Sequence, residues 1–150
     1  MSVELSTADD GDLDLIKLWG EWKRVNEVVR GAIIADVTAA LSIAEPDLNV
    51  LVHLRAAGGA MRQNALSLAT GWDRTRLSHL LTRMEERRHV RRQKLSTGVN
   101  VEMTAKGKAL LDIARTPLRT AIERHLLAPL GGTAAGSARL RSVLAALAKA

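Results

Sequence analysis

A set of hydrogen-bonding and cationic side chains recurs at helical spacing in the middle of the chain. One side of a helical wheel carries Thr75, His79, Thr82 and Arg83, flanked by Arg76 and Ser78. The opposite side carries Leu77, Leu80, Leu81 and Met84. Arginine offers a forked pair of donors to guanine, histidine and hydroxyl groups reach base edges or phosphates, and threonine methyl groups touch thymine. The pattern predicts a helix with one core side and one side suited to the major groove of duplex DNA.

The charge around this helix favours a polyanionic partner. Residues 73–94 hold eight of the 22 basic residues but three of the 16 acidic residues, so they carry +5 of the net charge of +6. An ordinary solvated helix face is the alternative interpretation. Such faces usually mix the two signs, whereas acidic residues enter the exposed side of this helix only at Glu85 and Glu86.

Composition narrows the class of protein. A chain of 150 residues fits one domain, and its pI near 10.5 points to nucleic acid or an anionic membrane surface. The membrane is the weaker alternative, because no apolar run is long enough to span a bilayer and the acidic N-terminus does not resemble a signal peptide. We therefore expect a cytoplasmic protein. The absence of cysteine excludes disulfides and zinc–thiolate sites, and the absence of Tyr and Phe leaves three tryptophans for base stacking.

The elements before and within the helical region follow from apolar spacing. A long amphipathic helix is predicted over residues 12–41, with more apolar surface than an end helix of one domain normally covers, so part of it is expected to meet a second subunit. A second helix begins near Pro46 and stops at Gly58. A short helix over 61–70, with Ala65, Leu66 and Ala69 inward, ends at Gly71, and Asp73 caps the next helix. Helix, tight turn, helix is the predicted arrangement.

The period changes after residue 89. Val99, Val101 and Met103 alternate with polar residues, and a turn signal at 96–98 separates two short extended runs, which predicts a hairpin. With Arg91, Arg92 and Lys94 on its first strand, the hairpin would form a wing along the phosphate backbone or into the minor groove. Further helices are predicted over 105–128 and over 137–148, the last with an apolar stripe that needs a partner.

The segments "GWDRTRLSHLLTRMEERRHVRR" (71–92) and "VEMTAKGKALL" (101–111) resemble the MarR family of winged helix-turn-helix transcriptional regulators, most closely an actinobacterial branch. The similarity extends over nearly the whole chain. It implies a mainly α fold with a small β-hairpin, in a single domain over 1–150. Within that domain, 45–104 would form the winged helix-turn-helix lobe, and 12–41 with 106–150 would form the dimerisation helices. It implies a homodimer that binds a pseudo-palindromic site in double-stranded DNA, and we expect this homodimer to act as a repressor.

Residue by residue, the resemblance assigns DNA contacts to three places. The base-reading positions fall on Thr75, Arg76, Ser78, His79, Thr82 and Arg83, and first-helix contacts with the backbone fall near Arg62, Gln63 and Asn64. Flanking phosphate contacts are assigned to Arg74, Arg92 and Lys94. Two places depart from the family: Arg88-His89-Val90 replaces Gly-Leu-Val, which predicts an uncommon backbone conformation at Arg88 or a shifted helix end, and the wing loop is about three residues short.

The sequence does not identify a particular small-molecule ligand. The resemblance implies a cleft for a small aromatic or anionic effector, which Trp19, Trp22 and His53 could line; packing of both tryptophans in the core or a dimer interface is the alternative. We expect no enzyme, cofactor or metal site, because the four histidines are scattered and no phosphate-binding glycine loop occurs. A nonspecific architectural DNA-binding protein or a protein-interaction module is the alternative function.

Overall fold

The computed structural model describes residues 7–149, and side chains from residue 11. The first six residues, part of the acidic N-terminal stretch, therefore lie outside the described residues. The chain divides into two compact units, one formed by its two ends and one by Asp36–Ala121. Among the described residues, no helix is both long and apolar enough to cross a membrane.

The end unit consists of long helices. Helix α1 (Thr7–Ala40) confirms the predicted amphipathic helix and begins five residues earlier than expected. Helix α5 (Ala105–Ile122) belongs to the Asp36–Ala121 unit except for its last residue, and the chain then continues in the end unit as a π-helical turn, η1 (Glu123–Leu127), and a 3-10 turn, η2 (Ala128–Leu130). Helix α6 (Thr133–Leu147) follows. Its predicted start at Ser137 is wrong by four residues, because the helix begins directly after Gly132 and includes the small residues before Ser137.

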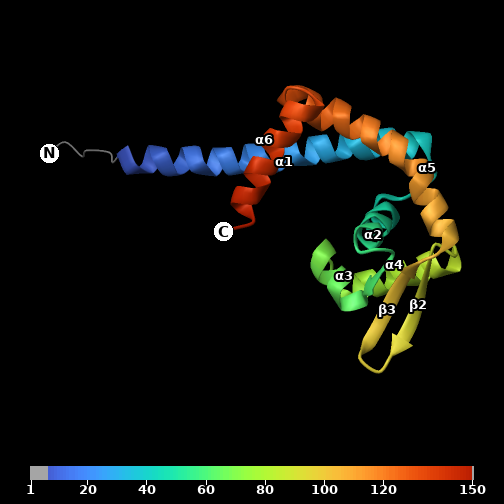
Figure 1. The fold of residues 1–150 in the computed structure, drawn as a ribbon. Helices are drawn as coiled ribbons and strands as arrows, with labels where there is room; N and C mark the ends of the chain where they lie inside the picture. Colours follow the sequence, from blue (N-terminus) through green and yellow to red (C-terminus); the bar gives the residue numbers. More distant parts are fainter. Residues whose placement is uncertain (1–6, 150) are drawn as a thin grey trace. The chain divides into compact units, whose positions relative to one another are not determined.

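The Asp36–Ala121 unit contains a helix-turn-helix and a sheet (Figure 1). Helix α2 (Glu45–Ala56) precedes strand β1 (Ala60–Arg62), helix α3 (Gln63–Thr70) and helix α4 (Arg74–Glu86). Strands β2 (Val90–Leu95) and β3 (Gly98–Met103) form the predicted hairpin, which extends away from the helices. The turn at 96–98 pairs Leu95 with Gly98. The fold is therefore mainly helical with a small antiparallel sheet.

Strand β1 corrects the prediction of a helix over 61–70. The sheet order is β1-β3-β2, and Met61 pairs with Val101 in an antiparallel register. Pairing with the hairpin thus takes Met61 and Arg62 out of the helix, which starts at Gln63. Of the three residues predicted to face inward on α3, only Leu66 is buried; Ala65 and Ala69 are exposed.

The core of the Asp36–Ala121 unit is made of aliphatic side chains from its helices and sheet. Burial of each large side chain contributes roughly 1.5 to 3 kcal/mol, which stabilises the positions of α3 and α4. The largest fully buried side chains are Val37, Val50, Leu51, Leu54, Leu66, Leu77, Leu81, Met84 and Val101.

Candidate nucleic-acid interface

A tight turn sets α4 against α3. Gly71 adopts the left-handed conformation at φ 69°, as predicted for the end of α3. The Oγ of Ser67 donates to the carbonyl oxygen of Trp72 at 2.6 Å, which closes the turn. Asp73 then caps α4, since its Oδ1 accepts the backbone N–H of Arg76 at 2.8 Å. The predicted helix, turn and cap are confirmed.

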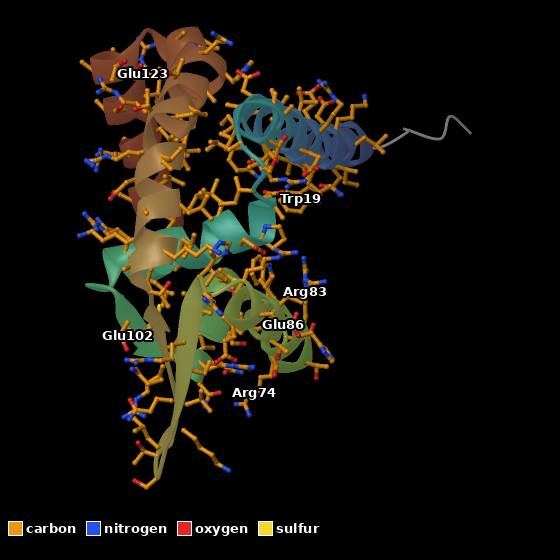
Figure 2. The ribbon with its side chains drawn as sticks, turned by 90° about the vertical axis from the view of Figure 1, so that its right-hand side faces the viewer. Trp19, Arg74, Arg83, Glu86, Glu102 and Glu123 are labelled. Carbon is orange, nitrogen blue, oxygen red and sulfur yellow. The ribbon has the colours of Figure 1, made fainter. Side chains whose placement is uncertain are left out.

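Helix α4 has the two sides that the sequence predicts. Leu77, Leu80, Leu81 and Met84 are buried. Thr75, Arg76, His79, Thr82 and Arg83 are exposed, whereas Ser78 is half-buried. In Figure 2, the labelled side chains of Arg74 and Arg83 lie on different sides of this helix. The structure therefore gathers the predicted base-reading residues on one exposed surface, which we call the α4 surface.

Arg76 has a partner that the sequence analysis missed. Its guanidinium carbon lies 5.0 Å from the centre of the Trp72 ring, within the range of a cation–π contact. Trp72 is half-buried at the turn before α4. The contact restricts where Arg76 can point, and the close sequence spacing of the two residues was the signal that could have indicated it.

The C-terminal end of α4 confirms one departure from the family pattern. Arg88 has φ 63°, and among the described residues it is the only non-glycine residue with positive φ. Its N–H donates to the carbonyl of Glu85 at 2.8 Å, and the N–H of His89 donates to that of Met84 at 2.9 Å. These two bonds form a Schellman motif in which Arg88 occupies the position that glycine usually takes. The end of α4 is therefore not shifted, and Arg88 itself adopts the left-handed backbone conformation that glycine usually takes there.

Two contacts fasten this end of α4 to its neighbours. Nη1 of Arg87 donates to Oδ2 of Asp47 on α2 at 2.8 Å, and the Asp47 side chain is 4% exposed. Nζ of Lys106 on α5 donates to the carbonyl oxygen of Arg87 at 3.0 Å. The end of α4 is thus held from α2 and from the start of α5.

The joint between α4 and the wing packs against the first turn of α5. The Oγ1 of Thr104 accepts the N–H of Gly107 at 3.0 Å, so Thr104 caps α5, and the same hydroxyl lies 2.6 Å from the carbonyl oxygen of Arg88. A Cβ on Gly107 would lie 2.2 Å from the carbonyl oxygen of His89. The threonine and the glycine of the "TAKG" segment therefore both serve this close approach.

His89 lies within that joint. Its Nδ1 is buried and has no hydrogen-bond partner among the described residues. Burial lowers the pKa of His89, the cation of Lys106 lowers it further, Asp47 raises it, and Arg87 lowers it. The joint therefore favours the neutral imidazole.

The wing is fastened to α4 through Arg92. Nε of Arg92 donates to Oε1 of Glu85 at 2.6 Å, and its backbone N–H donates to Oε2 of the same carboxylate at 3.0 Å. Nη2 of Arg92 donates to Oγ1 of Thr82 at 2.8 Å. Sequence analysis treated Glu85 only as an acidic residue of the helix end, although an acid and a base seven residues apart across a turn are a signal for such a pair.

The other two basic residues of the wing, Arg91 and Lys94, have different surroundings. Nη2 of Arg91 donates to Oε2 of Glu102 at 2.7 Å, directly across the hairpin. Lys94 is exposed near the tip. Of the two predicted phosphate contacts on the wing, Lys94 is therefore placed on the open surface, whereas Arg92 is half-buried against α4.

The remaining predicted residues lie at the start of α3, on α1 and on α2. Arg62 and Asn64, at the start of α3, are exposed, whereas Oε1 of Gln63 is buried without a hydrogen-bond partner among the described residues.

Trp19 and Trp22 are 59% and 48% exposed on α1, so they do not pack in the core of this chain. His53 belongs to the other unit and hydrogen-bonds through Nδ1 to the carbonyl of Asn49 at 2.8 Å. A shared effector site of Trp19, Trp22 and His53 stays a prediction. In the part of the chain that the structure describes, no group of three His, Asp or Glu side chains could hold a metal ion.

Comparisons with known proteins agree on the fold. AbsC, a MarR family transcriptional regulator from Streptomyces coelicolor, superposes with a TM-score of 0.76 at 23% identity, covering 99% of this chain and 97% of that one. A mutant MarR from E. coli, complexed with operator DNA, gives 0.74 at 21% identity, covering 89% of this chain and 95% of that one. The chain has the MarR-type winged-helix fold.

Further comparisons bear on the same MarR-type fold. Sco3205, a MarR family regulator from Streptomyces coelicolor in complex with DNA, gives a TM-score of 0.75 at 18% identity, covering 88% of this chain and 87% of that one. A family model described as "Domain of unknown function (DUF7343)" matches residues 43–98, which include α2, α3 and α4. Among curated proteins, none matches the chain. In this winged-helix fold, α4 is the second helix of the helix-turn-helix and the β2–β3 hairpin is the wing.

Proposed function

We propose that this protein is a sequence-specific double-stranded DNA-binding transcriptional regulator, located in the cytoplasm. The observation that carries the proposal is the α4 surface, which exposes Arg76, His79 and Arg83 opposite a fully buried apolar side. A helix of this kind at the second position of a helix-turn-helix can enter the major groove with its forked and hydroxyl donors toward base edges. Arg62, Asn64, Arg74 and Lys94 are exposed on the elements before α4, at its start and on the wing, and they supply phosphate contacts.

We further propose that the protein acts as a homodimer on an inverted repeat. Large apolar side chains lie exposed along α1, including Leu15 and Leu18 at 66% and 61%, and α6 exposes Leu144 and Leu147. Exposed apolar surface of this extent marks an interaction site, and a second copy of the chain supplies a matching surface. Two recognition helices related by twofold symmetry read two half-sites, so the operator is expected to be pseudo-palindromic.

Selection of bound duplexes from random DNA, followed by polarisation titrations, tests the DNA-binding function. A recovered inverted repeat supports a regulator. Binding that does not depend on sequence but falls steeply with salt supports the architectural alternative instead. Absence of binding at low salt favours the protein-interaction module.

A substitution separates base reading from charge. Arg76→Ala is expected to cost roughly 1 to 3 kcal/mol on the selected operator and to relax the preference at one base pair of each half-site. Equal weakening on every sequence would make Arg76 a phosphate contact. Arg55→Ala, at an exposed position of α2, is the control for a generic loss of one positive charge.

Light scattering at micromolar concentration tests the homodimer. A mass near twice 16.2 kDa is expected, and a monomer would contradict the proposal. Leu15→Asp should shift the protein toward monomer, because a carboxylate cannot be buried in an apolar interface without a partner. Lys17→Asp, at an exposed and already polar position two residues away, is the matched control.

The sign of regulation and the effector are tested separately. We propose repression, so transcription in vitro from a promoter that overlaps the selected operator should fall as the protein is added. A small aromatic or anionic effector should restore it by lowering the affinity for DNA. Trp19→Ala and Trp22→Ala should weaken the response to such an effector if these rings line its site.

A further inference from the structure

Arg92 directs its hydrogen bonds toward α4 rather than toward solvent. Beyond the bonds to Glu85, its Nη1 lies 3.4 Å from the carbonyl oxygen and 3.5 Å from the Oγ of Ser78. The side chain is 21% exposed, and the carboxylate of Glu85 beside it offsets its charge. A guanidinium in this setting has little free charge or free donor capacity left for a phosphate group.

The same network determines what Thr82 can offer to DNA. The hydroxyl of Thr82 donates to the carbonyl oxygen of Ser78 at 3.0 Å and accepts from Nη2 of Arg92 at 2.8 Å. A hydroxyl has a single hydrogen, so Thr82 has none left to donate to a base acceptor. Its second lone pair lies beside a cation, which disfavours the approach of a base amino group. The methyl group is the part of this exposed side chain that stays available.

From this arrangement, and resting on the DNA-binding function proposed above, we propose a division of roles between Arg92 and Thr82. Arg92 is a positioning residue that holds the wing and the hydroxyl of Thr82. Thr82 is a specificity-determining residue that reads DNA through its methyl group, against the C5 methyl of a thymine in the major groove.

Replacement of single thymines by deoxyuridine in the selected operator tests the role of Thr82, because deoxyuridine lacks only the C5 methyl group. At one position in each half-site, the replacement should lower the affinity of the wild-type protein about fourfold, as expected for loss of one buried methyl group. Thr82→Val keeps a methyl group but loses the hydroxyl that Arg92 holds, so it should still discriminate between the two duplexes, although more weakly than the wild-type protein. Thr82→Ser keeps the hydroxyl and loses the methyl group, so it should bind both duplexes equally.

Two results would overturn the role assigned to Thr82. In one, no thymine position affects the wild-type affinity. In the other, Thr82→Ser discriminates between thymine and deoxyuridine as the wild-type protein does. Because the operator is selected with wild-type protein beforehand, failure to recover any operator refutes the proposed function itself and is distinguishable from either result.

Salt dependence tests the role of Arg92, with Lys94 as its matched partner on the same strand. Lys94→Gln should reduce the slope of log affinity against log salt by about 0.9 for each phosphate group that the variant no longer neutralises. Arg92→Gln should leave the slope unchanged while it weakens the thymine discrimination of Thr82. A slope reduced as much by Arg92→Gln as by Lys94→Gln would make Arg92 a phosphate-binding residue and overturn its positioning role.

Discussion

The carboxylate of Asp47 and the guanidinium of Arg87 lie 2.8 Å apart and join α2 to the end of α4. The two partners have unequal surroundings, since the Asp47 side chain is 4% exposed and that of Arg87 is 54% exposed. The buried partner therefore depends on the exposed one. Because 40 residues separate them in the chain, the pair constrains how α2 packs against the end of α4.

Removal of Arg87 should destabilise the protein through Asp47. Arg87→Met is expected to lower the free energy of unfolding by roughly 1 to 3 kcal/mol, because it leaves a buried carboxylate without its guanidinium. Urea denaturation at fixed protein concentration measures this. Asp47→Asn combined with Arg87→Met should cost less than the sum of the two single changes. Additive costs would show that the pair is not coupled.

Replacement of Arg88 by glycine should stabilise the protein. Arg88 holds φ 63° at the end of α4, whereas Gly58 holds φ 85° at the corresponding position after α2. A side chain in the left-handed region costs on the order of 1 kcal/mol, and glycine avoids that cost. Arg88→Gly should therefore raise the melting temperature, and Arg88→Ala, which keeps the Cβ, should not. If both substitutions raise the melting temperature equally, the gain comes from the loss of the positive charge and not from the backbone conformation.

Local patterns made α4 predictable from sequence. The cap at Asp73, the end of α3 at Gly71 and the burial of Leu77 and Leu81 each depend on residues within one helix or one turn. Helical periodicity alone decides which side of such a helix is buried. The unusual backbone of Arg88 was likewise visible as a missing glycine.

Pairings between distant segments were not predictable in the same way. Strand β1 has three residues and no alternating pattern, and it exists because Met61 pairs with Val101 on β3. The bonds of Arg92 to Glu85 and Thr82 depend on how the wing folds back on α4, which no periodicity encodes. Sequence analysis therefore found the exposed side of α4 but did not predict the partners of Arg92 within the protein.

Gly107 should tolerate no larger residue. A Cβ at this position would meet the backbone oxygen of His89 at 2.2 Å and a methyl group of Leu51 at 3.2 Å, and the backbone cannot move aside as a flexible side chain can. Gly107→Ala should cost about 1 to 3 kcal/mol of stability, as overpacking typically does, although alanine favours helices. Lys108→Ala, at the next and exposed position of α5, is the control for thermal unfolding. Equal melting temperatures for the two variants would contradict the close packing.

Acidification should destabilise the protein through His89. Its pKa in the folded protein lies below the ordinary 6.5 because of burial and the nearby cation of Lys106. Well above pH 6.5, the imidazole is neutral in both folded and unfolded chains, so His89 contributes no pH dependence to the free energy of unfolding. As the pH falls from there toward the folded pKa, only the unfolded chain binds the proton, and the free energy of unfolding decreases by at most about 1.4 kcal/mol per pH unit.

Urea denaturation between pH 8 and pH 5 measures this loss as the slope of the free energy of unfolding against pH. His89→Gln should remove the part of that slope that His89 contributes. Lys106→Met should reduce the loss as well, because the cation that helps to lower the pKa of His89 is gone. Lys108→Met, which removes an exposed cation of the same helix outside this joint, should leave the slope as in the wild-type protein. If His89→Gln and wild-type protein lose stability in parallel, the pH dependence arises elsewhere, and the neutral imidazole at the joint is refuted.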